Sequence, residues 1–395
     1  MAKGVYIKSE EHKRRIGESL KRKYAEAAPM KKIDVLPHSH ETTSKIFTNP
    51  SAYEESIRPE SLADFIGHAN IKRELDIILK SSTQLNQPIG HILLTGAAGT
   101  GKTSLASIIA REAKANIVTG FASSVKKQQD VIRFFNQFLW RGCDEKGRII
   151  GPIDQNILIL DEIHQLPEPE LFFSLMEDRM ISIKYQDILS SEEQIRKVRV
   201  QPWCLIGLSN RAGELPPALL ERFKYIFHLE TYEQKELQII LFHAAHKLGV
   251  NINEKALAHI AESSKGIPRI AIAYLERCRN VQLMTHASMI TDEIVSKTFS
   301  MIGLFEQGLT SCDVKILSYL YRIAPNKIGI NRLASLINET PKAFANTIEP
   351  FLSKNEFIIT TPSGRTLGRS GAEYLKKQGL ITLPKEDEIL RLEQK

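Results

Sequence analysis

Cysteine is scarce in this chain, and its four copies lie far apart. Cys143, Cys204, Cys278 and Cys312 form no C-x-x-C pair, and no histidine stands at a spacing suited to zinc. Disulfide scaffolds and zinc fingers both require cysteines at short, regular spacings. The pattern therefore argues against both classes and predicts reduced, structural thiols in a cytoplasmic protein.

Long hydrophobic runs are also missing. No stretch approaches the roughly 18 consecutive apolar residues of a membrane-spanning helix, and the first residues lack the apolar segment of a signal peptide. We therefore expect neither a membrane protein nor a secreted one. The 395 residues of the chain are enough for about two to four domains with buried cores.

Charge of one sign is only in small excess, since 53 Lys and Arg residues stand against 46 Asp and Glu. A nucleic-acid partner must therefore be argued from where the basic residues lie. They crowd residues 1–56, which predict a basic N-terminal extension with a helix over 9–27, followed by a polar linker. A solvated tail is the alternative for this segment. Its many acidic residues argue against a mitochondrial transit peptide.

The string GAAGTGKT at residues 96–103 stands between an apolar run and a stretch of helical character. It has the form G-x-x-x-x-G-K-[ST], in which glycines such as Gly96, Gly99 and Gly101 let backbone N–H groups surround phosphates. Lys102 would reach the β- and γ-phosphates, and the Thr103 hydroxyl would hold Mg²⁺. The string therefore predicts a site for ATP and Mg²⁺.

Apolar runs alternate with helical stretches over residues 57–230, which predicts an α/β domain with a five-stranded parallel sheet. The predicted strands, all expected to be buried, cover residues 91–95, 116–119, 157–160, 203–207 and 225–229. In open sheets of this kind, ligands bind beyond the carboxyl ends of the strands. Polar residues that follow the strands are therefore candidates for the site.

Two further strand ends carry such residues. Asp161 is placed to hold Mg²⁺, and Glu162 to polarise the attacking water. His164 has no second metal ligand near it in sequence, so we expect it to pack or to form hydrogen bonds. Asn210 could bind the γ-phosphate or the lytic water. Arg222 is either a surface arginine or a finger that reaches a neighbouring subunit's nucleotide.

Several strings in this chain resemble the RuvB family of AAA+ Holliday-junction branch-migration motors. They are IRPESLADFIGHANIKRELDIIL, GKTSLASIIARE, LDEIHQL, RAGELPPALLERF, HLETY and GIPRIA, and the likeness extends over residues 57–380. The resemblance implies an AAA+ P-loop NTPase core, a helical lid and a C-terminal winged helix. It also implies a ring of subunits, six by resemblance, that acts on duplex or branched DNA.

The resemblance assigns roles to single residues as well. It places the adenine against the backbone around Ile57, Arg58, Ile66 and Gly67 and beside Tyr232. It makes Arg222 the finger supplied in trans and Arg269 the arginine of the second sensor. Ser104 stands where the family usually has threonine, beside the phosphate-binding residues.

Residues 231–305 predict the helical lid, with helices over 232–248, 254–264, 268–283 and 291–302. Thr231 and Gln234 form a T-x-x-Q pattern, which predicts a capping box with Tyr232 in the first helical turn. Pro268 suits the first position of the third helix, so Arg269 would lie in that helix's first turn. From there it could touch a γ-phosphate and report hydrolysis.

Residues 306–383 predict a winged helix, followed by a tail over 384–395. Helices are expected over 312–323, 330–337 and 341–352, with Thr340 as an N-cap and with Pro350 ending or kinking the third. Strands over 357–362 and 366–367 would be joined by a Ser-Gly-Arg turn. The expected phosphate contacts, on exposed parts of this domain, are Lys342, Lys354, Arg365 and Arg369. Ser363 replaces one of the wing's usual arginines, which weakens the expected contact.

Two other departures from the family pattern affect the interpretation. In RuvB proteins, a largely apolar hairpin holds the junction-binding partner RuvA. The corresponding residues of this chain, 180–200, are instead rich in charge. Whether a RuvA-like partner exists is therefore open. Residues 139–153 look like an insertion, and their glycines predict a loop.

Two alternative functions follow from the same residues. One is an AAA+ loader or switch that uses ATP to place a partner protein on DNA, as clamp loaders and initiators do. The other is a DNA-binding regulator whose nucleotide site no longer hydrolyses ATP. Every catalytic position sought is filled, which favours the motor.

Overall fold

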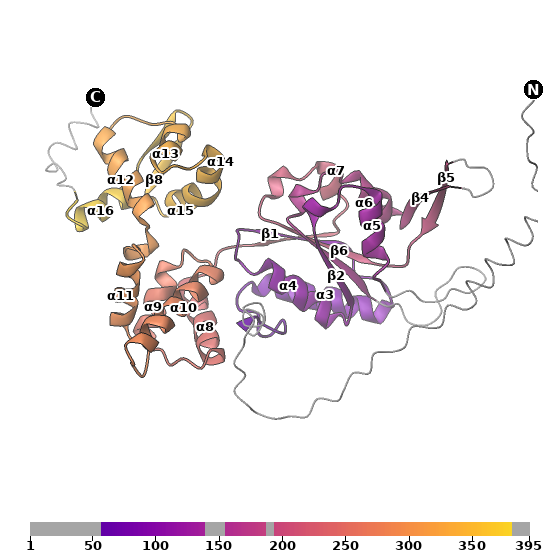
Figure 1. Ribbon diagram of the computed structural model, residues 1–395, viewed down its shortest axis with the longest axis horizontal. Coiled ribbons are helices and arrows are strands. Elements are labelled where there is room, and N and C mark those ends of the chain that lie inside the picture. Colours follow the sequence, from indigo (N-terminus) through magenta and orange to yellow (C-terminus); the bar gives the residue numbers. More distant parts are fainter. Residues whose placement is uncertain (1–56, 139–154, 187–192, 381–395) are drawn as a thin grey trace, which may run out of the picture. The chain divides into compact units, whose positions relative to one another are not determined.

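The computed structural model describes residues 57–138, 155–186 and 193–380. The predicted basic helix, the predicted insertion at 139–153 and the tail over 384–395 lie outside the described residues. Figure 1 shows the described elements, with an α/β domain, a helical domain and a winged-helix domain following one another along the chain.

Five parallel strands form one sheet in the order β2-β3-β6-β1-β7. Their bounds are β1 (Ile92–Gly96), β2 (Asn116–Phe121), β3 (Asn156–Asp161), β6 (Cys204–Ser209) and β7 (Tyr225–Leu229). The predicted five-stranded parallel sheet is thus confirmed. Because β6 lies between β1 and β3, the residues that follow β6 stand between the glycine-rich loop and the acid pair.

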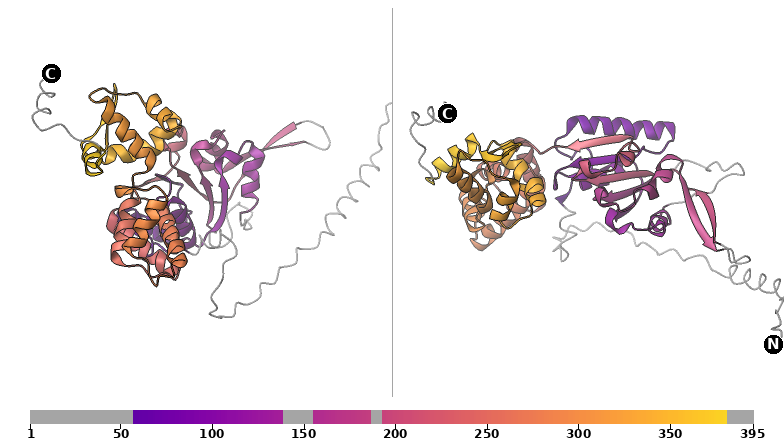
Figure 2. Two further views of the ribbon diagram at one scale, coloured as in Figure 1. Left: turned by 60° about the vertical axis from the view of Figure 1, so that its left-hand side comes forward. Right: turned by 90° about the horizontal axis from the view of Figure 1, so that it is seen from above.

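The sheet separates two hydrophobic cores, since successive side chains of a strand point to opposite faces. Leu93, Leu158 and Leu205 face one core, while Leu94 and Ile206 face the other. The helices of this domain are α3 (Ala69–Leu85), α4 (Lys102–Glu112), α5 (Gln128–Phe135), α6 (Glu170–Glu177) and α7 (Pro217–Leu220). Figures 1 and 2 show α3 and α4 on one face and α5 and α6 on the other.

The expectation that all five strands are buried is wrong for the two outer ones. In β2 only Val118 is buried, and the Phe121 side chain at its end is 64% exposed. In β7 only Phe227 and Leu229 are buried. Each of these strands has a partner on one side only, so part of its surface meets solvent.

An antiparallel hairpin extends from the α/β domain. Its strands are β4 (Met180–Gln186) and β5 (Glu193–Arg199), with Met180 opposite Arg199. Figure 2 shows it standing away from the five-stranded sheet. The hairpin expected from the family pattern is thus present, although its sequence is charged.

The helical domain consists of the four predicted helices. They are α8 (Gln234–Lys247), α9 (Glu254–Ser263), α10 (Pro268–Met284) and α11 (Asp292–Met301). The predicted capping box of Thr231 and Gln234 is wrong, because α8 begins only at Gln234. Glu233 caps it instead, and the Glu233 N–H donates to the Glu236 carboxylate at 3.0 Å. Tyr232 therefore precedes the helix and lies in the connection between the two domains.

In the winged-helix domain, the predicted third helix is divided into α14, η5 and α15, and the described residues include one further helix, α16. The elements of this domain are α12 (Ser311–Ile323), α13 (Ile330–Leu336), α14 (Pro341–Ala343), the π-helical segment η5 (Phe344–Ile348), α15 (Glu349–Lys354), β8 (Ile358–Thr361), β9 (Gly364–Leu367) and α16 (Arg369–Lys377). The Thr340 side chain caps α14, as expected, by accepting from the Ala343 N–H at 3.1 Å. The predicted kink corresponds to the π-helical turn η5, which precedes Pro350. Proline has no N–H to donate to the preceding turn, and helices often deviate from regular α-geometry at such a position.

The turn of the wing begins one residue earlier and ends two residues earlier than predicted. Thr361 pairs with Gly364, so Pro362 and Ser363 form the turn and Arg365 belongs to β9. Gly364 adopts a φ of +141° and lies against the backbone of Ile328, where a Cβ would be 2.7 Å from the Ile328 carbonyl oxygen. Arg365 therefore lies within the hairpin and not at its tip.

The remaining short helices are η1 (Ala122–Ser124), η2 (Ile163–Gln165), η3 (Ala212–Glu214) and η4 (Glu306–Gly308). Among the described residues, no helix combines the length and the apolar character needed to cross a membrane.

Candidate nucleotide-binding site

The glycine-rich loop (residues 96–103) joins β1 to α4 and has little room for side chains. A Cβ at Gly96 would stand 2.3 Å from the Leu229 carbonyl oxygen, and one at Gly99 would stand 2.9 Å from Ile267. Gly101 precedes the first turn of α4, and no side chain caps that turn. Uncapped N–H groups at a helix N-terminus attract anions. The loop is therefore shaped to receive phosphate.

Lys102 begins α4 and is held over this loop. Its ammonium donates to the carbonyl oxygens of Gly96 at 2.9 Å and Ala97 at 2.8 Å, and the residue is only 9% exposed. Burial lowers the pKa of Lys102, while the negative charges of Asp161 and Glu162 act to raise it. Both carboxylates follow β3, which is separated from β1 only by β6, so they lie at the same edge of the sheet as Lys102. Thr103 and Ser104 follow it in the first turn of α4.

The acid pair lies at the end of β3, where the chain turns sharply. The Glu162 N–H donates to the Asp161 carboxylate at 2.8 Å, and Glu162 adopts a φ of +52°. Such a left-handed conformation is uncommon for a residue with a Cβ and is found most often at functional sites. It directs Glu162 away from the line of the strand. Its side chain remains 37% exposed and can reach a water molecule.

The end of β6 contributes Ser209 and Asn210. Ser209 is buried, whereas Asn210 is exposed immediately beyond the strand, on the side where the acid pair and the loop lie. His164 Nδ1 lies 3.1 Å from the Ser209 hydroxyl, so this histidine forms a hydrogen bond as expected. Among the described residues, no cluster of three His, Cys, Asp or Glu side chains could hold a metal ion.

The predicted adenine-binding residues gather around Tyr232. Its hydroxyl donates to the Thr100 carbonyl oxygen at 3.2 Å, and a Cβ at Gly67 would stand 3.0 Å from its ring. Ile57 packs against the same helical core as Tyr232, and half-buried Ile66 precedes Gly67. The Arg58 carbonyl accepts from the Lys247 ammonium at 3.0 Å. These contacts bring the start of the α/β domain beside the connection to the helical domain.

Two residues of this region were not anticipated. Phe65 lies beneath Gly101, where a Cβ would stand 3.2 Å from its ring. The ring of His68 meets Tyr232 edge-on, with 4.9 Å between centroids. Both belong to the string FIGH around Gly67. Their position next to a predicted adenine-binding residue is the only sequence feature that could have indicated them.

Arg269 lies where the helical domain touches the glycine-rich loop. It follows Pro268 at the start of α10, and its N–H donates to the Gly99 carbonyl oxygen at 3.4 Å. Its positive charge also acts to lower the pKa of Lys102. Arg269 therefore shares the neighbourhood of the predicted phosphate site.

Arg222 contacts α6 of its own chain. Its guanidinium lies 2.8 Å from the Glu177 carboxylate and 4.0 Å from the centre of the Phe173 ring, and it donates to the Ala218 carbonyl oxygen. The side chain is only 18% exposed. Through these contacts the arginine is supported at the edge of the α/β domain.

The prediction that all four DNA-contact residues are exposed is wrong for Arg365. Its guanidinium donates to both oxygens of Glu349, at 2.8 and 3.0 Å, and its side chain is 19% exposed. Burial acts to raise the pKa of Glu349, but hydrogen bonds from Arg365 and Thr360 outweigh it and lower that pKa. The cause is the position of Arg365 within β9, which turns its side chain toward α15.

The other three residues are accessible but have partners. Lys342 lies 3.1 Å from the Glu214 carboxylate, and Lys354 donates to the Thr231 hydroxyl at 2.8 Å. Arg369 pairs with Glu373 at 2.9 Å, and its side chain is 86% exposed. Exposed pairs of this kind contribute little to stability. These three side chains can therefore exchange their present partners for a DNA phosphate with little loss of stability.

Replacing Arg365 with alanine is expected to lower the stability of the winged-helix domain by about 2 kcal/mol, because Glu349 would lose two charged hydrogen bonds.

Replacing exposed Arg369 with alanine should leave the stability unchanged. It should reduce the slope of DNA affinity against salt concentration by the amount expected for about one phosphate contact. Urea unfolding and DNA binding across salt concentrations test both. A stable Arg365→Ala protein with weakened DNA binding would contradict this assignment.

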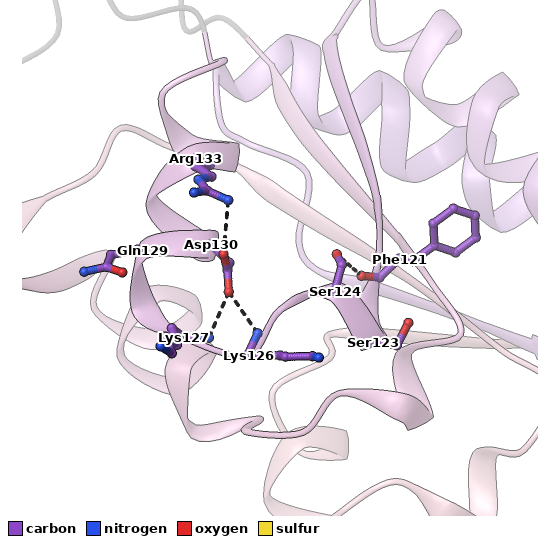
Figure 3. A pocket seen from close by; sticks show the side chains of 8 residues that line it. All are labelled: Phe121, Ser123, Ser124, Lys126, Lys127, Gln129, Asp130 and Arg133. Carbon is purple, nitrogen blue, oxygen red and sulfur yellow. Dashed lines mark hydrogen bonds and ion pairs between the residues drawn. The ribbon is translucent and has the colours of Figure 1, made fainter.

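A shallow hollow lies at the carboxyl end of β2, where Phe121 is the register partner of Asp161 in β3 (Figure 3). Its lining consists of Phe121, Ser123, Ser124, Lys126, Lys127, Gln129, Asp130 and Arg133. Figure 3 shows the Asp130 carboxylate directed at the N–H groups of Lys126 and Lys127, at 3.1 and 3.0 Å, and at Arg133. The Asp130 carboxylate is therefore bound by groups of its own segment. The exposed side chains of Lys126 and Lys127 give the hollow a positive charge.

Three family models match consecutive parts of the chain. The model of the Holliday junction DNA helicase RuvB P-loop domain covers residues 57–229, and that of the RuvB AAA lid domain covers residues 232–304. The model of the RuvB C-terminal winged helix domain covers residues 306–376. The three matches have the order and content of the domains described above.

Individual proteins agree with these models. The Holliday junction branch migration complex subunit RuvB of Fervidobacterium nodosum is 34% identical over 334 residues, 83% of this chain and 90% of that protein. RuvB of Ehrlichia ruminantium is 33% identical over 328 residues, 82% of this chain and 93% of that protein.

A solved structure extends this agreement to the fold. The Thermotoga maritima RuvB Holliday junction branch migration motor is similar with a TM-score of 0.68 and 32% identity, covering 83% of this chain and 100% of that one. The likeness in sequence and fold therefore spans all three described domains, and the chain belongs to the RuvB family.

Proposed function

We propose that this protein is an ATP-driven motor that moves Holliday junctions or related branched DNA. One observation carries the proposal. Lys102 lies over the glycine-rich loop, Arg269 contacts that loop, and the acid pair ends β3 at the same edge of the sheet, in a chain that matches RuvB models from its P-loop domain to its winged helix. A phosphate loop with a neighbouring acid pair is suited to hydrolysing ATP, and a winged helix to holding DNA.

The chain's own residues divide the work on ATP. Backbone N–H groups between Gly96 and Thr103 bind the phosphates, and Lys102 leaves its two loop carbonyls to reach the β- and γ-phosphates. Glu162 orients and polarises the attacking water, together with Asn210, which follows the end of β6. The backbone around Ile57, Arg58, Ile66 and Gly67, with Tyr232, holds the adenine.

The donor set also suits Mg²⁺, because a hydroxyl in the first turn of α4 and a carboxylate at the end of β3 are hard oxygen ligands near the phosphate loop. Thr103 and Asp161 would hold the ion, and Ser104 follows in the same turn. When bound, the ion supplies positive charge that neutralises the phosphate oxygens.

Completion of the pocket requires a second copy of the chain. Arg222 is supported on α6 by Phe173 and Glu177, so its guanidinium is anchored at the surface of its own subunit. We propose that it meets the nucleotide of a neighbour in a closed ring, most simply a hexamer. Head-to-tail contacts that close into a ring use two different faces of each subunit, which such a finger requires.

Hydrolysis would reach DNA through the helical domain. The N-terminus of α10 contacts the loop through Arg269 and Gly99, so loss of the γ-phosphate changes what Arg269 can touch. The winged-helix domain then moves with the lid, and Lys342, Lys354 and Arg369 offer charge to DNA phosphates. The hairpin of β4 and β5 is rich in charge, so a RuvA-like subunit that docked on it would have to present complementary charges.

The proposal is tested by measuring ATP hydrolysis with and without four-way-junction DNA, together with the mass of the assembly in a non-hydrolysable nucleotide. We expect junction-stimulated hydrolysis, a ring-sized mass and movement of a labelled junction. A protein that hydrolyses ATP slowly, responds to DNA and moves no junction, alone or with a junction-binding partner, would be a loader instead.

A further inference from the structure

His164 is a buried histidine that lies between the ends of β3 and β6. Its side chain is 2% exposed, with Nδ1 3.1 Å from the Ser209 hydroxyl and Nε2 3.2 Å from the Glu162 carboxylate. Gly207 makes this approach possible, because a Cβ there would stand 2.7 Å from Ile163, the residue before His164. One imidazole thus connects the last residue of β6 with the proposed catalytic carboxylate.

The surrounding groups determine which ring nitrogen carries the proton. The Ser209 hydroxyl oxygen accepts from the Arg211 N–H at 3.0 Å, which leaves its own proton free to be donated. A carboxylate can only accept, so Nε2 must carry the proton to interact favourably with Glu162. Nδ1 is then the acceptor for Ser209. The order of donation is Arg211 N–H to Ser209, Ser209 to Nδ1, and Nε2–H toward Glu162.

The last step of this series is incomplete in the conformation described. Although Nε2 lies near the Glu162 carboxylate, it makes no hydrogen bond with any described residue. A buried N–H without an acceptor costs about 1–3 kcal/mol, so a rotation of Glu162 that closes this bond is favourable. Glu162, held at a φ of +52°, can therefore alternate between His164 and water.

We propose that His164 is a positioning residue that sets the orientation of Glu162 and couples it to the end of β6. This inference rests on the proposed function, because it assumes that Glu162 polarises water. Ser209 is 1% exposed in a strand paired on both sides, so it is a rigid support for the imidazole. Through this support, the imidazole sets the position of the Glu162 carboxylate relative to Asn210, which directly follows Ser209.

The first test compares two replacements of His164. His164→Phe keeps a ring without its nitrogens, and His164→Gln keeps one donor and one acceptor at a similar reach. We expect His164→Phe to lower kcat by about 10- to 100-fold, because a misplaced catalytic group costs up to about 10²-fold. KM for ATP and the affinity for a non-hydrolysable analogue should stay within about twofold. His164→Gln should recover most of kcat.

Ser209→Ala provides a second variant that leaves His164 in place. It removes the donor to Nδ1, so the proton can move to Nδ1 and turn a lone pair toward Glu162. We expect a smaller fall in kcat than with His164→Phe. Adding Ser209→Ala to His164→Phe should lower kcat no further, since both changes act through one interaction. Independent, multiplying losses would contradict the proposed series.

The outcomes separate this inference from the proposed function. A wild-type protein that hydrolyses no ATP contradicts both. A wild-type protein with normal turnover and a His164→Phe variant of unchanged kcat contradicts the inference alone. The same holds if His164→Phe raises KM and weakens analogue binding in proportion to its loss of rate, because His164 would then only support the fold.

Discussion

Replacing Glu162 with glutamine is expected to slow ATP hydrolysis by about 10²- to 10⁴-fold while ATP binding is retained. The amide has almost the volume of the carboxylate, so the turn at the end of β3 should be preserved. It cannot accept a proton from water, and this loss affects the chemical step. A single-turnover assay and a binding assay with a fluorescent ATP analogue separate the two effects.

Glu168→Gln is the matched control for this variant. Glu168 is exposed six residues further along the chain and lies outside the proposed site. Its replacement should leave hydrolysis and binding unchanged. Normal hydrolysis by Glu162→Gln would show that another group activates water. If a Glu162→Gln protein that no longer hydrolyses ATP still acted on junctions, the result would instead favour the alternative of a DNA-binding regulator that does not need hydrolysis.

The Arg222→Ala variant is expected to lose even more activity, by about 10³- to 10⁵-fold, the contribution of fingers supplied in trans. ATP binding should persist, because Lys102 and the loop belong to the other subunit at each pocket. Hydrolysis should be measured at protein concentrations where the ring is assembled, with its mass recorded in the same buffer. Normal turnover by an assembled Arg222→Ala protein would contradict the ring-motor account.

A structural explanation for such a loss must be tested separately, because Arg222 also pairs with Glu177 and stacks on Phe173. Glu177→Gln removes the ion pair and leaves the guanidinium free to reach a neighbour. We expect this variant to keep most of its ATP hydrolysis. If it fell as far as Arg222→Ala, the arginine would matter for its own subunit's packing and not for a neighbour's nucleotide.

Much of the fold could be predicted because its signals are local. The five strands of the sheet, the four helices of the lid and the cap at Thr340 follow from runs of apolar residues and from turn chemistry. Errors arose where several local patterns were possible. Thr231 and Glu233 can both begin a helix, and the acidic partner at Glu236 favoured the second.

Contacts between distant residues were beyond the reach of such patterns. Arg365 looked like a free cation in a wing, but the register of β8 and β9 carries it to Glu349, sixteen residues earlier. Similarly, nothing local indicated that His164 would meet Ser209, because their contact depends on the pairing of β3 with β6. The roles of single residues in the site remain proposals for the same reason: each depends on neighbours far along the chain or in another copy.

The central claim is that each ATP pocket combines Glu162 of one subunit with Arg222 of the next, and mixing two inactive variants tests it most directly. Glu162→Gln and Arg222→Ala subunits, combined in equal amounts and allowed to assemble, would form about a quarter of their interfaces with both groups intact. The account predicts that hydrolysis returns in the mixture to a comparable fraction of the wild-type rate. A mixture that assembles into rings and remains inactive would contradict it, as would full-rate hydrolysis by a protein that stays a single copy.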